Sequence, residues 1–230
     1  MAIIHETTVT PSKLDLLKAW LPAQPWYLGA EGEPDLTRAG GFRLDDPAGE
    51  VGIEFMVVTD GSGDEGAAYL VPLTYRGRAL DGGEGALVGT MQHGVLGHRW
   101  IYDGTRDPVL AAQLAALIRG EAEPQAQSIS NTPDPTVIVT PVAGGGPGGQ
   151  LAVRINRVLR SGEDGGTDAG GSVLADGGTG AGGNLRADGG LGAAEAAPDG
   201  QPWQPCLSAT WRRPDGTLAR GFFASARPQA

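Results

Sequence analysis

The chain has 230 residues, with 27 acidic and 17 basic side chains and a formal net charge of −10. This negative charge argues against a general nucleic-acid binder or a protein of anionic membranes, because both need a cationic face. The single cysteine, Cys206, excludes an internal disulfide framework and a thiolate-rich zinc site. Since the N-terminal residues lack the basic and apolar regions of a signal peptide, we expect a cytoplasmic protein.

The first part of the chain alternates apolar segments with short turns, as a folded domain does. Leu14, Leu17 and Leu21 recur at helical spacing and predict a helix from Pro11 to Leu21, with Thr10 as its N-cap. Turn sequences rich in Asp, Gly and Pro then separate five strand-like segments. These segments cover residues 41–46, 51–60, 67–75, 86–93 and 95–104. Their short connections predict that consecutive strands pair as an antiparallel meander.

A second helix is predicted from Pro108 to Arg119. Asp107 precedes it as a cap, an apolar stripe runs along it, and Gly120 follows as its C-terminal stop. One helix, a curved antiparallel sheet and a closing helix indicate an α+β domain over residues 1–125. We expect the first helix to lie in the concavity of the sheet.

The composition of the chain changes after Gln125. Residues 126–160 and 203–230 predict a module of further antiparallel strands, with residues 136–142 and 151–159 as one strand each, around a long insertion at residues 161–202. The insertion has no aromatic residue, and its first 40 positions hold fourteen glycines, seven acids and one base. Such a composition cannot bury enough apolar area to offset the chain entropy, so we predict that residues 161–202 are disordered.

Few motifs point to chemistry. Gly144, Gly146 and Gly149 satisfy a G-x-G-x-x-G pattern between two predicted strands, which indicates either a phosphate-covering loop or a glycine-rich hairpin. No helix follows this pattern, which excludes a dinucleotide-binding fold. The catalytic and metal-binding patterns of kinases are absent after Arg160. Cys206 is interpreted as a core thiol.

Aromatic residues with polar tips can form a sugar-binding face or a partner interface, and they can equally fill a core. We select three aromatic residues as candidate contacts, with three arginines on turns as rim contacts. They are Trp26, Tyr27 and Trp100, with Arg76, Arg78 and Arg106. If the three aromatics are core residues instead, their replacement would unfold the domain.

Several segments together resemble the N-terminal cap domain of maltokinases. They occur in order within residues 2–125 and include TPSKLDLLKAWLPAQPWY, GFRLDDPAGEVGIEFMVV, VPLTYRG and WIYDGTRDPV, of which the last two are the most specific. The later segments AQSISNTPDPTVIVTPV and LAVRINRVLRSG are similar to the start of a kinase N-lobe. There a strand carries a lysine that pairs with nucleotide phosphates, and in this chain Arg154 stands at that place.

The resemblance implies a cystatin-like sheet that grips a helix, and a setting in maltose-1-phosphate, trehalose and α-glucan metabolism. It does not imply phosphotransfer, because the residues of the catalytic lobe are not found. We therefore expect a non-catalytic, cap-like binding or regulatory module without a cofactor, a metal, nucleic acid or a membrane. Its partner would be a kinase-type or α-glucan pathway protein. The alternatives are a sugar or small-ligand binder that uses the concave sheet face, and a degenerate sugar kinase.

Overall fold

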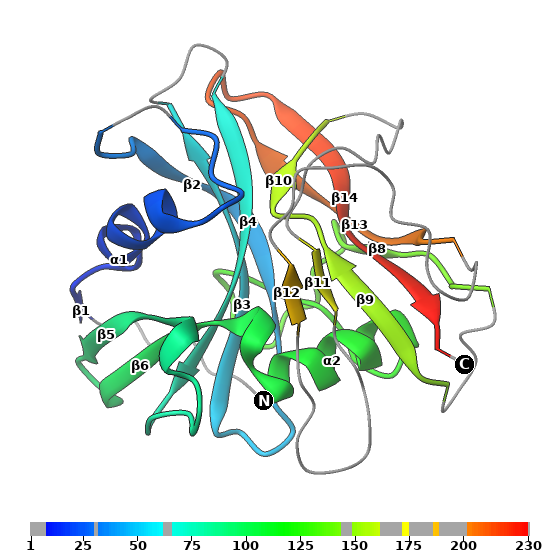
Figure 1. Ribbon diagram of the computed structural model, residues 1–230, viewed down its shortest axis with the longest axis horizontal. Helices are drawn as coiled ribbons and strands as arrows, with labels where there is room; N and C mark the ends of the chain where they lie inside the picture. Colours follow the sequence, from blue (N-terminus) through cyan, green and yellow to red (C-terminus); the bar gives the residue numbers. More distant parts are fainter. Residues whose placement is uncertain are drawn as a thin grey trace.

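The computed structural model describes residues 8–29, 32–61, 66–143, 149–161, 172–174, 186–188 and 202–229. These residues form a large curved sheet and two α-helices, and all of the strand pairs recorded between them are antiparallel (Figure 1). The α+β class expected from the sequence is confirmed. No helix in the described ranges is long and apolar enough to cross a membrane.

The first part of the chain contains six strands, two α-helices and three short 3-10 helices. In chain order they are β1 (Val9–Thr10), α1 (Lys13–Trp20), η1 (Leu21–Ala23), β2 (Leu36–Leu44), β3 (Val51–Asp60), β4 (Ala67–Arg76), η2 (Glu84–Ala86), β5 (Leu87–His93), β6 (Gly97–Asp103), η3 (Gly104–Arg106) and α2 (Pro108–Ile118). The later strands are β7 (Gln125–Ala126), β8 (Ile138–Val139), β9 (Leu151–Ile155), β10 (Val158–Leu159), β11 (Ser172–Leu174), β12 (Arg186–Asp188), β13 (Gln204–Arg212) and β14 (Leu218–Pro228).

The main sheet has the strand order β1-β5-β6-β4-β3-β2-β13-β14-β9. Strands β2, β3 and β4 pair consecutively, as the sequence predicted. The expected pairing of β4 with β5 is wrong, because β6 lies between them and pairs Trp100 with Arg76 of β4. The physical reason is that β5 and β6 form a local hairpin, while residues 77–86 give the chain enough length to reach its outer strand.

Helix α1 begins two residues later than predicted. Its N-cap is Ser12, not Thr10: the Ser12 Oγ accepts the Asp15 N–H at 3.2 Å, and the Ser12 N–H donates to Asp15 Oδ2 at 3.0 Å. Thr10 lies in β1 instead and pairs with Gln92 of β5, so the backbone of Thr10 is extended. Leu17 and Leu21 are fully buried against one face of the sheet, so this helix packs on the sheet through its apolar side chains.

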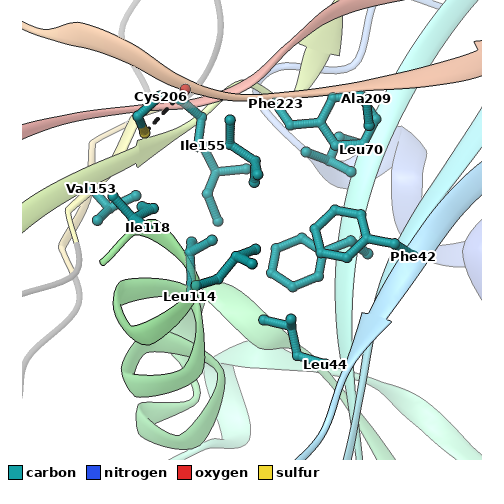
Figure 2. Packing of buried hydrophobic residues seen from close by; sticks show 14 of the residues in the cluster. Phe42, Leu44, Leu70, Leu114, Ile118, Val153, Ile155, Cys206, Ala209 and Phe223 are labelled. Atoms are coloured by element: carbon teal, nitrogen blue, oxygen red, sulfur yellow. Dashed lines mark hydrogen bonds between the residues drawn. The ribbon is translucent and has the colours of Figure 1, made fainter. Parts of the chain in front are cut away.

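Helix α2 packs on the opposite face of the sheet. Asp107 caps it by accepting the Val109 N–H at 3.0 Å, and Gly120 follows with a φ of 75°, in the left-handed region that favours glycine. The helix predicted here is confirmed. Leu114 and Ile118 point into a core that also contains residues of β2 and of β9, β13 and β14 (Figure 2).

The second part of the chain completes this core. Strand β13 pairs with β2, β9 pairs with β14, and β10 pairs with β4. Residues 151–159, predicted as one strand, are therefore divided between two edges of the sheet. The division falls at Asn156 and Arg157: the Asn156 N–H donates to Phe223 O, and the Leu70 N–H donates to Arg157 O, both at 2.9 Å. As a result the sheet curls around the core.

The disorder predicted for residues 161–202 falls mainly outside the described residues. Within that range the structure describes Ser161, Pro202 and the two strands β11 and β12, which pair with each other. Gly144 and Gly146 of the glycine pattern also lie outside the described residues, and Gly149 lies at the start of a described range.

Candidate functional site

The segment from Asp103 to Asp107 forms a corner between β6 and α2. Both oxygens of the buried Asp107 carboxylate accept N–H groups of Arg76, each at 2.7 Å. These hydrogen bonds raise the pKa of the Arg76 guanidinium above its ordinary value. Arg76 was selected as a rim contact, but its side chain is only 13% exposed and fastens β4 to the start of α2.

Arg157 reaches the same corner from the later part of the chain. Its Nη2 lies 2.6 and 2.5 Å from the two carboxylate oxygens of Asp103 and donates to Thr105 Oγ1 at 2.9 Å. Its guanidinium carbon lies 5.0 Å from the centroid of the Trp26 ring. Arg157 is 1% exposed, so this arrangement is a buried ion pair supported by an aromatic face.

Sequence reasoning missed Arg157 because the apolar pattern of residues 151–159 predicts a single strand. The available signal was the polar pair Asn156-Arg157 inside an apolar run. A charged residue in such a run is either at a break in the strand or paired in the core, and here it is both.

Trp26 is a core residue, only 9% exposed. Its ring centroid lies 5.9 Å from that of Trp20 and 5.9 Å from that of Tyr69. Tyr27 is half-buried beside it, and its hydroxyl lies 2.6 Å from Asp60 Oδ2. The core alternative that the sequence left open is therefore the one that describes the environment of Trp26.

The β5–β6 hairpin carries Trp100, the third aromatic candidate. Its ring meets that of His98 edge-on at a centroid distance of 4.3 Å, and His98 Nδ1 lies 2.8 Å from Gln92 Nε2. At the turn, His93 Nδ1 accepts the N–H groups of Val95 and Leu96 at 3.2 and 3.1 Å. The His93 imidazole thus satisfies two backbone N–H groups of the turn.

This turn leaves two adjacent apolar side chains in the solvent. Val95 is 60% exposed and Leu96 is 45% exposed, and Leu87 at the start of β5 is 40% exposed. Arg78, on the turn after β4, and Arg106, in η3, are also exposed. We call Val95, Leu96, His98 and Trp100 the hairpin surface. The sequence did not single out Val95 or Leu96, although their position between Gly94 and Gly97 is typical of an apolar turn.

Arg154 lies on β9, with its guanidinium carbon 4.7 Å from the centroid of the Trp203 ring. Arg227 of β14 lies over the same ring at 5.0 Å. The structure therefore places Arg154 in an arginine–tryptophan stack.

Cys206 is 1% exposed, and burial raises the pKa of its thiol to about 12. The core position expected for this cysteine is confirmed, and the thiol is protonated at neutral pH. Across the described ranges, no three or more His, Cys, Asp or Glu side chains come together in a way that could hold a metal ion.

Glu54 is the centre of a buried polar network that sequence reasoning also missed. It lies 2.5 Å from Lys13 Nζ and 2.5 Å from the Tyr75 hydroxyl, and it accepts Gln127 Nε2 at 2.7 Å. Burial alone would raise the pKa of Glu54, but the charge and hydrogen bond of Lys13 hold it below its ordinary value. Burial and the neighbouring carboxylate raise the pKa of Tyr75 well above its ordinary value. The network ties the start of α1 to β3 and β4.

These features describe a β-rich module in which the buried polar clusters of Asp107, Arg157 and Glu54 join helices and strands. One hairpin of the module presents an apolar tip. Residues 20–107 match the family model described as the maltokinase N-terminal cap domain. This match confirms, over these residues, the resemblance seen in the sequence. The match includes Trp26, Asp103 and the hairpin surface, and it ends before Arg157. No curated protein matches the chain.

Proposed function

We propose that this protein is a non-catalytic cap-like module that acts by binding a kinase-type protein. The proposed setting is the cytoplasmic metabolism of maltose 1-phosphate, trehalose and α-glucans. The choice of partner is supported by the match to the maltokinase cap family, because this domain is named as part of a kinase. The proposal of binding rather than catalysis is supported by the roles of the polar clusters, which are engaged in capping α2 and in joining strands.

The hairpin surface is the proposed contact. A pair of adjacent apolar side chains held in solvent by an ordered turn offers a partner area to bury without a large cost in ordering. Trp100, half-buried next to them, supplies an aromatic anchor of the kind that dominates interfaces. Arg78 and Arg106 remain proposed rim contacts. The exposure of Val95 and Leu96 is the observation that carries this choice of surface.

The test is a titration of the purified protein with a recombinant maltokinase catalytic core from which the enzyme's own cap has been removed. Val95→Asp and Leu96→Asp should each weaken binding by about 30-fold, the effect of losing a contact of about 2 kcal/mol. Ile129→Asp is the matched control, because Ile129 is also 60% exposed but lies outside the hairpin. Failure of the wild-type protein to bind this core, or equal weakening by Ile129→Asp, would overturn the proposal.

The sugar-binding alternative has less support. It places a ligand on the concave face of the sheet, but both faces of β3 and β4 are filled: Leu17 and Leu21 of α1 are fully buried on one face, and Leu114 of α2 is buried on the other. The degenerate-kinase alternative is tested by an assay of maltose phosphorylation. Turnover by the wild type that exceeds turnover by Arg154→Ala would favour it over a binding module.

A further inference from the structure

One guanidinium of the β5–β6 hairpin has no partner in the described ranges. Arg99 of β6 is half-buried, and it makes no hydrogen bond, ion pair or ring contact with any residue there. The other buried or half-buried arginines differ from it. Arg76, Arg119 and Arg157 each contact a carboxylate, and the remaining ones also have partners. Arg99 is therefore the exception among the arginines of the described ranges that are not fully exposed.

The Arg99 side chain lies over the backbone of the turn that follows β4. Arg99 pairs with the buried Met91 of β5 and points to the face of the hairpin opposite Trp100, because neighbours along a strand alternate. A Cβ atom at Gly77 would lie only 2.8 Å from Arg99 Nη1, so this position suits a residue without a side chain. The Nε atom of Arg99 is buried without a hydrogen-bond partner, whereas its two Nη atoms reach the solvent. The guanidinium therefore presents its terminal amino groups to a ligand.

A cation in this position lacks a counter-charge. Burial of Nε takes part of the Arg99 guanidinium out of water, and no carboxylate in the described ranges replaces the lost hydration. An anionic group of a ligand would replace it. The two Nη groups hold four N–H donors in one plane, and this arrangement matches the two oxygens of a carboxylate. The geometry therefore favours a planar anion of this kind.

We propose that Arg99 binds a carboxylate side chain of the kinase-type partner. This inference rests on the proposed function, and it names the chemistry of the partner's surface. Arg99 lies three residues from Leu96 in extended chain, a distance of about 10 Å. The partner would bury Val95 and Leu96 and would present an aspartate or a glutamate at that distance, on the side of the hairpin opposite Trp100.

The local charge argues against a nucleic acid or another polyanion at this site. Residues 77–103 hold three acids and two arginines, a net charge of −1. A polyanion needs several cations along its backbone, and this segment does not supply them. A carboxylate on a protein needs only one guanidinium, and one matched pair of charges adds specificity to an apolar contact. The expected partner is therefore a protein surface with an acidic residue beside an apolar depression.

The experiment titrates the full chain with the maltokinase catalytic core that lacks its own cap. Arg99→Met should weaken binding by about tenfold, because it removes hydrogen bonds between charged groups but keeps an apolar side chain of similar length. Arg99→Glu should weaken binding further, since it brings two carboxylates together. Arg160→Met and Arg160→Glu are the matched controls and should bind as the wild type does, because Arg160 is exposed and lies outside the hairpin. Arg99→Met should leave the Tm of the free chain unchanged, since no partner within the chain is lost.

The results separate this inference from the proposed function. If the wild type fails to bind the core, both are overturned. If Val95→Asp weakens binding and Arg99→Met does not, only this inference is overturned. Equal weakening by Arg99→Met and Arg99→Glu would show that the partner presents no carboxylate there. A lower Tm for Arg99→Met would assign the guanidinium a partner within the chain, and a dimer that this variant dissociates would assign it to a second copy; either result would overturn the proposal.

Discussion

Replacement of Arg157 by methionine should be among the most destabilising single changes in this protein. The side chain is 1% exposed and its Nη2 contacts both oxygens of Asp103 and the hydroxyl of Thr105. Arg157→Met keeps much of the volume but leaves the Asp103 carboxylate, itself 9% exposed, without its counter-charge. Removal of one partner of a buried ion pair costs about 3–5 kcal/mol of unfolding free energy.

The assay is urea unfolding followed by circular dichroism, together with a thermal melt. For a chain of this size each kcal/mol corresponds to about 2–4 °C in Tm, so the loss predicts a Tm lower by roughly 6–20 °C. Arg160→Met is the control, because Arg160 is exposed and lies three residues further along the chain. It should change the unfolding free energy by less than about 0.5 kcal/mol.

A second variant separates the ion pair from the packing of the arginine. Asp103→Asn removes the charge but keeps an oxygen that can accept the Thr105 N–H. The double variant Arg157→Met/Asp103→Asn should be more stable than the sum of the single losses predicts, by about 1 kcal/mol or more. A loss below about 1 kcal/mol for Arg157→Met, or strict additivity in the double variant, would refute the reasoning.

Three other predictions follow from the packing and the pKa shifts. Glu54 has a pKa below its ordinary value, so the stability it contributes is present above that value and is lost as the pH falls. The difference in unfolding free energy between the wild type and Glu54→Gln should therefore shrink from about pH 6 to about pH 3, and a constant difference would contradict this. Cys206 should not react with a disulfide reagent in the native protein and should react fully in urea; rapid native reaction would show that the thiol is accessible. Trp26→Ala should cost about 3–5 kcal/mol and Trp100→Ala much less, as measured by urea unfolding, and equal losses would place both side chains in the core.

The sequence predicted the elements whose signals are local. Helix α2 has a cap, a proline at its first position and an apolar stripe, and all three lie within a dozen residues. Strand β3 was predicted with its observed bounds because Asp-Gly and Asp-Pro turns flank it. The N-cap of α1 was assigned to Thr10 because Ser12 offers the same chemistry two residues later, and only the Asp15 side chain decides between them.

The features that could not be predicted depend on contacts between distant residues. The position of β6 between β4 and β5 is set by the β4–β6 pairing, which leaves no mark in either segment. The pairing of Arg157 with Asp103 spans 54 positions of the sequence, and that of Glu54 with Gln127 spans 73. A buried charge shows that a partner must exist, but its identity comes from the fold.

The candidate contact residues also depend on contacts between distant parts of the chain. The sequence does not distinguish the environments of Trp26 and Trp100, since each lies in a short segment that contains both polar and apolar residues. Burial distinguishes them, because α1 and Arg157 cover Trp26, whereas Trp100 lies on a hairpin near the sheet edge. Val95 and Leu96 were not selected because they fall within residues 95–104, a segment predicted as strand and not as an exposed turn.

The central claim is that the protein binds a kinase-type partner through the hairpin surface. Its most direct test is amide hydrogen exchange of the full chain with and without the maltokinase catalytic core. The account predicts slower exchange at residues 93–98 in the complex and little change at β9 and β14. Unchanged exchange at residues 93–98 in a complex that has formed would contradict the claim.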